Sequence, residues 1–229
     1  MKKKKAIITL LVAVLSIALI ILVCIYFLDN TGKVNQGNFR INDAVLESYI
    51  TVEETQEDNV TELSNIVMNI TQENKLSLLI ANNSNISSMY IDNISTTTAP
   101  EKLGELKIKQ EGKEDSIDCF NKEGKYDLNV QKKDEQYFVE LKITNNNCLQ
   151  NVNVPSETKV IKYDGTILDL LNRKIEEFKF SITFNLNIVE ESGKLNTCKI
   201  SLDMPEDSLI TNGASVTRLD NANLLFTVK

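Results

Sequence analysis

The chain has 229 residues, with 25 basic against 32 acidic side chains, no histidine and no tryptophan. The lack of histidine excludes Ser-His-Asp and Cys-His catalysis and most zinc hydrolase sites. The net charge of −7 argues against a nucleic-acid-binding surface, because such surfaces are rich in lysine and arginine.

The first 28 residues predict a membrane anchor. Lys2–Lys5 form a basic cluster, and Ala6–Leu28 then run without a charged side chain. A helix of that length is about 34 Å long, enough to cross a bilayer core of roughly 30 Å. Because positive flanks stay in the cytoplasm, residues 1–5 are expected inside and the rest outside. That outer part holds 21 basic against 32 acidic residues, a net charge of −11.

Two cleaved alternatives start from the same pattern. A secretory signal has an apolar region of about 7–15 residues that ends in small residues, whereas this one is longer and ends in bulky Ile25–Leu28. A lipoprotein would use Cys24, but Val23 is larger than the usual Gly or Ala before a lipidated cysteine. An uncleaved anchor is therefore favoured. The bias towards Asn, Lys and Ile is typical of an AT-rich genome, which suggests a Gram-positive bacterium.

Beyond the anchor, residues 29–38 are predicted to form a flexible spacer. After the spacer, apolar and polar residues alternate with a period of two. Residues 43–49 fit a helix or a strand, and a strand is favoured, while 53–59 reads as an acidic loop. Alternation predicts strands over residues 66–70, 76–80, 106–108, 126–130, 137–143, 178–188, 198–204 and 224–228. The main helical candidate is 166–172.

Two hairpins are expected. The clearest joins 178–188 to 198–204 through the turn Glu191–Lys194, and a second joins 126–131 to 137–143 through the polar turn Lys132–Glu135. About eleven or twelve short strands at this spacing are typical of antiparallel sandwiches.

The sequence thus predicts a mainly β fold: a transmembrane helix, then one or two antiparallel β-sandwich units, Ig-like or jelly-roll-like. The polar, strand-free segment Glu111–Asp115 is the predicted domain boundary, with one unit over 39–112 and another over 113–229. A single domain over 39–229 is the alternative.

Three cysteines lie beyond the anchor, which allows one disulfide and one free thiol. Cys198 lies on the apolar face of a predicted strand and reads as a buried, inert thiol. Cys148 follows Asn145–Asn147, a predicted turn, so a Cys119–Cys148 disulfide is expected, with no disulfide as the alternative. No C-x-x-C pair and no histidine is available for zinc.

We predict no catalytic, cofactor or metal site. Glu176–Glu177 and Glu190–Glu191 are adjacent pairs, and adjacent strand residues point to opposite faces, so they are expected to flank strands as solvated charges rather than to act together on a glycosidic bond. The expected function is a non-catalytic interaction or structural module at the cell surface, with an envelope protein as its partner. The alternatives are a pilin-like, secretion or sporulation-apparatus subunit, or an unrecognised cell-envelope enzyme.

Overall fold

The computed structural model describes residues 36–54, 65–82, 84–98, 103–121, 123–133, 135–155 and 166–228. The predicted basic tail, the anchor over Ala6–Leu28 and most of the spacer lie outside these ranges. Within them, no helix is both long and apolar enough to cross a membrane. Residues 37–229 form one compact unit, and strands on both sides of the Glu111–Asp115 loop belong to the same sheet.

The described residues are mainly β, as the alternation predicts. The strands are β1 Gln36–Glu54, β2 Asn65–Asn82, β3 Ile86–Thr96, β4 Glu105–Gln110, β5 Ile117–Asp118, β6 Tyr126–Leu128, β7 Gln131–Lys133, β8 Gln136–Pro155, β9 Phe180–Glu190, β10 Leu195–Met204, β11 Ala214–Arg218 and β12 Leu225–Val228. Three of them have 18 to 20 residues. The sequence broke β2 into two strands and did not predict β3, β5, β7 or β11; β7 overlaps the expected polar turn Lys132–Glu135.

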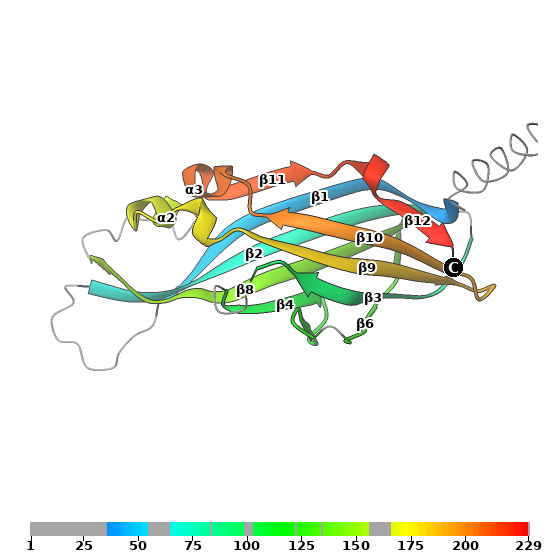
Figure 1. Ribbon diagram of the computed structural model, residues 1–229, viewed down its shortest axis with the longest axis horizontal. Helices are drawn as coiled ribbons and strands as arrows, with labels where there is room; N and C mark the ends of the chain where they lie inside the picture. Colours follow the sequence, from blue (N-terminus) through cyan, green and yellow to red (C-terminus); the bar gives the residue numbers. More distant parts are fainter. Residues whose placement is uncertain are drawn as a thin grey trace, which may run out of the picture. The chain divides into compact units, whose positions relative to one another are not determined.

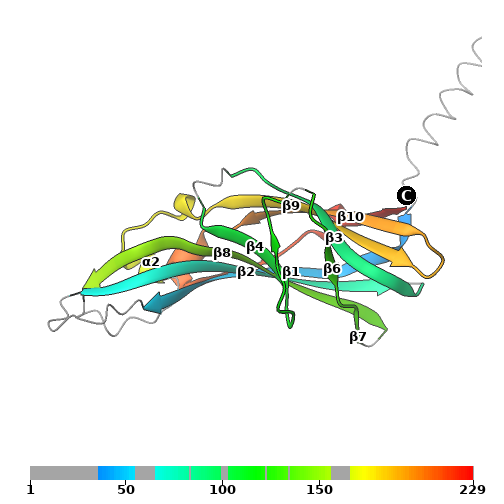
Figure 2. The ribbon, with the colours of Figure 1, turned by 90° about the horizontal axis from the view of Figure 1, so that it is seen from below.

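All twelve strands join in one sheet, in the order β5-β4-β8-β2-β1-β12-β10-β9-β3-β6, with β11 beside β1 and β7 beside β8 (Figure 1). The sheet is antiparallel and nearly closed. In Figure 2, β9 and β10 lie on one side, and β1, β2 and β8 on the other. Period-two apolar residues give the longer strands one apolar face, and the sheet buries that face by curling round it.

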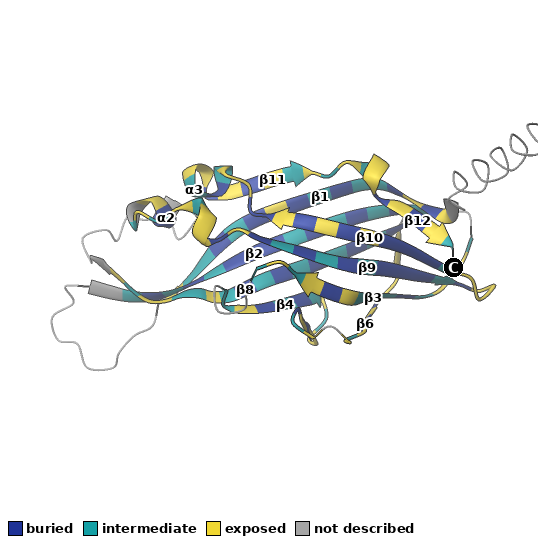
Figure 3. Ribbon diagram, viewed as in Figure 1, coloured by how far each residue is buried: buried dark blue, intermediate teal, exposed yellow. Residues whose placement is uncertain are grey.

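The main hydrophobic cluster fills the inside of this curl (Figure 3). Inward residues of β9, such as Phe184 and Leu186, are fully buried, and they meet inward residues of β2 and β8 such as Leu78 and Val139. Intervening side chains such as Thr183 face outward and are partly exposed. Burial of these side chains supplies the main stabilising free energy of the fold.

A second, smaller cluster lies at the carboxyl end of β1 and the amino end of β2, which are adjacent in the sheet. Two short helices, α2 Thr166–Leu170 and α3 Ser208–Asn212, and the 3-10 turn η3 Ile175–Glu177 lie at that end. Apolar residues in and beside these helices pack against the apolar face of the long strands. The buried members of the cluster are Ile50, Met68, Ile70, Ile167, Leu168, Phe178 and Leu209. The helix predicted over 166–172 is therefore confirmed, although it is shorter.

Asparagines bend the strands rather than end them. Asn145–Asn147 was expected to be a turn, but β8 continues through it to Pro155. Asn147 and Asn151 have φ values of 51° and 54°, and the register of β2 against β8 shifts beside them. Asparagine tolerates this left-handed conformation, which suits a β-bulge. The expected turn is therefore wrong, because a left-handed asparagine can sit inside a strand.

Of the two expected hairpins, one is confirmed. β9 and β10 pair from Val189 opposite Leu195 to Phe180 opposite Met204. The second is wrong: β6 pairs with β3, and the strand that returns along β8 is the three-residue β7. Local alternation was read correctly there, but the partner of β6 comes from a distant part of the chain.

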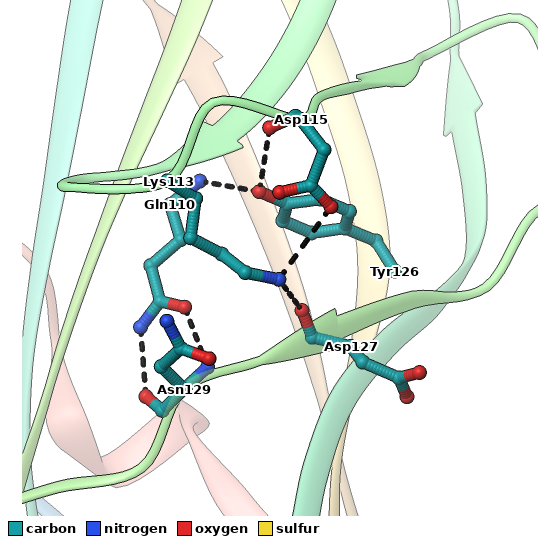
Figure 4. A network of polar contacts seen from close by, with 6 residues as sticks. All are labelled: Gln110, Lys113, Asp115, Tyr126, Asp127 and Asn129. Carbon is teal, nitrogen blue, oxygen red and sulfur yellow. Dashed lines mark hydrogen bonds and ion pairs between the residues drawn. The ribbon is translucent and has the colours of Figure 1, made fainter.

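A glutamine side chain links the two ends of the sheet, together with other contacts to β6 (Figure 4). The Gln110 side chain at the end of β4 donates from Nε2 to the Asn129 carbonyl at 2.8 Å and accepts from the Asn129 N–H at 2.6 Å. A side-chain amide thus makes the two hydrogen bonds that a neighbouring strand would make. Gln110 is 2 % exposed whereas Asn129 is exposed, so these bonds are partly buried.

Near the start of β1, the buried carboxylate of Glu190 connects three segments of the chain. Glu190 accepts from Asn196 Nδ2 at 2.8 Å, Ser192 Oγ at 3.1 Å and Asn38 Nδ2 at 3.1 Å. The bond from Asn196 is the largest cause that lowers the pKa of Glu190, with the other two adding to it. The ionised form therefore holds the β9–β10 turn to the start of β1.

This arrangement predicts a pH-dependent stability. Because the folded pKa of Glu190 is lowered, its contribution is complete above the unfolded pKa of about 4.3 and is lost as the pH falls through the folded pKa. We expect Glu190→Gln to lower the free energy of unfolding by about 1–2 kcal/mol at pH 7, and the deficit to shrink below about pH 4. Urea unfolding across this range measures both.

The matched control is Glu191→Gln, since Glu191 is an exposed neighbour that receives one exposed bond, from Asn85. We expect it to change stability by less than about 0.5 kcal/mol. If the loss of free energy of unfolding in Glu190→Gln stays constant from neutral to acidic pH, the ionised carboxylate of Glu190 does not have the stabilising role assigned to it.

Candidate functional site

The candidate site is a groove of about 480 Å³ on the outer face of β4 and β8, walled by the loop Glu111–Ser116. Four lysines line it: Lys107, Lys109, Lys113 and Lys142, together with Thr144 and Asn146. Two carboxylates, Glu111 and Glu114, lie on the wall. The groove therefore presents more ammonium than carboxylate groups in a part of the chain whose net charge is −11.

The pairing of the strands sets the lysines side by side. Lys142 on β8 lies directly opposite Lys109 on β4, and directly opposite Lys75 on β2. Neighbouring strands are about 4.8 Å apart, so this places three positive side chains in one row across the sheet. Like charges directly opposite each other destabilise a sheet, so the row needs compensation.

Two of the three lysines of the row have a carboxylate partner. Lys75 Nζ lies 2.5 Å from Glu140 Oε1, and Lys142 forms an ion pair with Glu73. Glu73 is itself held by the Tyr49 hydroxyl at 2.9 Å and the Thr51 hydroxyl at 3.2 Å. Burial, followed by the bond to Glu73, raises the pKa of Tyr49 above its usual range, so this hydroxyl remains a donor.

Lys109 is the exception. Within the described ranges its ammonium has neither a hydrogen bond nor an ion pair. The residue is nevertheless half-buried, with Lys107 on the same strand and Lys142 opposite it on β8. Lys107 is paired with exposed Glu105 at 2.8 Å, and this bond raises the pKa of Lys107. An exposed pair of this kind is worth about 0–1 kcal/mol and exchanges easily with a better partner.

The wall of the groove is fixed by β6, which belongs to the other end of the sheet (Figure 4). The Tyr126 hydroxyl accepts from the Gln110 N–H at 3.0 Å and donates to the Asp115 carbonyl at 2.9 Å. Lys113 Nζ donates to the Asp127 carbonyl at 2.7 Å and lies 4.7 Å from the centre of the Tyr126 ring. The loop is therefore attached to β6 at Lys113 and Asp115, and Gln110, the residue before the loop, is attached as well.

Chemically, this site is suited to holding a negatively charged oxygen. A lysine that acts as a general base needs a lowered pKa, whereas the pKa of Lys107 is raised. In the parts of the chain that the structure describes, no group of three or more His, Cys, Asp or Glu side chains could hold a metal ion. Ammonium groups at the groove can bind a carboxylate through charge-assisted hydrogen bonds.

The predicted cysteine sites lie elsewhere. Cys119 is buried in the main cluster, whereas Cys148 packs against the second cluster and donates from Sγ to the Ile70 carbonyl at 3.2 Å. The three cysteines in the described ranges are free thiols in this structure, so the expected Cys119–Cys148 bridge is not formed. Burial raises the pKa of Cys148 to about 11 and that of Cys198 to about 12. Cys198 is fully buried, as its alternation predicts.

Sequence reasoning missed the groove. The strand expected over 106–108 is confirmed, and Lys107 and Lys109 alternate there with Leu106 and Ile108, but the alternation alone gave these lysines no role. Their meeting with Lys142 depends on the pairing of β4 with β8, which lie about 35 positions apart in the chain. Comparison with family models, curated proteins and solved structures found no match.

The hydroxyl of Tyr126 offers a test of how the wall is held. Tyr126→Phe removes the acceptor of the Gln110 N–H and the donor to Asp115 while keeping the ring. We expect the free energy of unfolding to fall by about 1–2 kcal/mol, because a buried N–H loses its partner. Urea unfolding gives this value.

Tyr90→Phe is the control, since Tyr90 on β3 also lies beneath a lysine, with Lys125 Nζ 4.2 Å from its ring, and no hydrogen bond of its hydroxyl is found in the described ranges. That variant should differ from wild type by less than about 0.5 kcal/mol. Equal losses in the two variants would show that the hydroxyl of Tyr126 does not hold the loop.

Proposed function

We propose that the chain is a non-catalytic interaction module outside the cell, held at the membrane by residues 6–28, whose lysine-lined groove binds a carboxylate group of an envelope protein. The observation that carries the proposal is Lys109, a half-buried residue whose ammonium has no ion-pair partner in the described ranges and which lines a groove of about 480 Å³. A carboxylate placed there gains a charge-assisted bond and relieves the repulsion between Lys109 and Lys142.

The acidity of the surrounding surface supports a selective site rather than a general one. A net charge of −11 repels acidic partners over most of the surface, so an acidic segment gains only where lysines gather. The fixed wall favours binding as well, because a loop that is already ordered loses little entropy when a partner docks.

The topology belongs to the same proposal. Lys2–Lys5 keep the amino terminus in the cytoplasm, and the apolar run anchors the chain in the lipid bilayer. The finer fold classes expected from the strand pattern, Ig-like or jelly-roll-like sandwich, stay predictions, as does the Gram-positive source.

The groove is tested with a fluorescent peptide rich in glutamate and a matched peptide in which glutamine replaces each glutamate. Full-length protein in nanodiscs of neutral lipid is titrated against both, and anisotropy is recorded at several salt concentrations. We expect the glutamate peptide to bind more tightly, and Lys109→Gln to weaken that binding about fivefold, which corresponds to about 1 kcal/mol.

The control variant is Lys199→Gln, which removes the same charge from an exposed position of β10 outside the groove. It should leave the affinity for the glutamate peptide unchanged within about twofold. Equal weakening in both variants would indicate only a general charge effect, and equal binding of the two peptides would refute a carboxylate site.

A further inference from the structure

A layer of polar side chains crosses the inside of the sheet between the two hydrophobic clusters. It consists of Ser48 on β1, Gln72 and Asn74 on β2, and Asn145 on β8. Each is at most 2 % exposed. They occupy inward positions of the same alternation that places Leu46, Leu76 and Ile143 in the main cluster and Ile50 and Ile70 in the second.

Most polar atoms of the layer are paired. Ser48 Oγ donates to Asn74 Oδ1 at 2.6 Å, and Gln72 Nε2 donates to the same oxygen at 3.3 Å. Asn74 Nδ2 donates to the Ile143 carbonyl at 3.1 Å. The backbone N–H of Gly104 donates to Asn145 Oδ1 at 2.7 Å.

Gly104 makes that last bond possible by its lack of a side chain. A Cβ at this position would lie 1.8 Å from the Asn146 carbonyl oxygen, so the backbone ahead of β4 can approach β8 this closely only with glycine. The Asn145 side chain is therefore fixed from one side by the backbone of Gly104.

Two atoms of the layer have no hydrogen-bond partner among the described residues: Gln72 Oε1 and Asn145 Nδ2. Their identities are fixed by the bonds above. Exchanging O and N in Asn145 would set two donors against each other at Gly104, and doing so in Gln72 would set two acceptors together at Asn74. The free atom of Gln72 is therefore an acceptor, and that of Asn145 is a donor.

These two residues are neighbours across the sheet. Gln72 is directly opposite Asn145 in the pairing of β2 with β8, and the register shifts between Ile70 and Gln72. A buried donor or acceptor without a partner costs about 1–3 kcal/mol. We propose that an internal water molecule binds between them, accepts from Asn145 Nδ2 and donates to Gln72 Oε1. Buried waters typically bind in this way to polar groups that lack a protein partner.

The water site would also help specify the register of β2. The apolar residues of β2 repeat every second position, so a shift by two residues would keep the apolar face inside. Such a shift would carry Gln72 away from Asn145 and Asn74 away from the Ile143 carbonyl, and so break the hydrogen bonds of the layer. A hydrated layer at one position therefore selects one register over its neighbours.

The test is a crystal structure of the full chain at a resolution that shows ordered waters. We expect an electron-density peak within hydrogen-bond distance of both Gln72 Oε1 and Asn145 Nδ2. A direct bond between these two atoms, or no peak while both remain unpaired, would overturn the proposal.

A variant supplies a second measurement. Gln72→Met removes the acceptor, so the peak should be lost and the midpoint of urea unfolding should fall. Gln131→Met, at an exposed position of β7, is the control and should keep both the peak and the midpoint. If Gln72→Met does not fold, the structure of the wild-type chain alone still decides the proposal.

Discussion

The fold depends on one constraint: a single long sheet with one apolar face has to hide that face from water. Ten strands in succession, with β7 and β11 alongside, provide no second sheet to cover it, so the sheet curls until its ends approach. Hydrophobic burial drives the curl, but it does not determine where the ends meet. The Gln110 amide does so, because it forms both hydrogen bonds with the backbone of Asn129.

The groove depends on that closure. Its floor consists of β4 and β8, near one end of the sheet, whereas its wall is attached to Tyr126 and Asp127 on β6, at the other end. The same junction thus closes the core and orders the loop beside Lys109. On the outer face, ion pairs such as Lys75–Glu140 compensate the row of lysines in all but one position. Lys109, the lysine of that row without a carboxylate partner among the described residues, lies where the sheet also forms a groove.

Local pattern was readable from the sequence, and distant pairing was not. The alternation of Phe180–Ile188 predicted β9 and its hairpin because both strands and their turn are neighbours in the chain. β6 was placed correctly, but its partner β3 carries weaker alternation and was not predicted. The turn expected at Asn145–Asn147 was wrong because asparagine, here Asn147, serves turns and bulges equally well. The groove could not be found, since it exists only after Lys109 and Lys142 are brought into register.

The closure by Gln110 is tested most directly by hydrogen exchange in the full chain carrying Gln110→Met, with the exposed Gln131→Met as control. The account predicts that the Asn129 amide exchanges about tenfold faster or more in Gln110→Met, while the amides of the β9–β10 hairpin keep their protection. Unchanged protection of the Asn129 amide in Gln110→Met would contradict the claim that this side chain joins the two ends of the sheet.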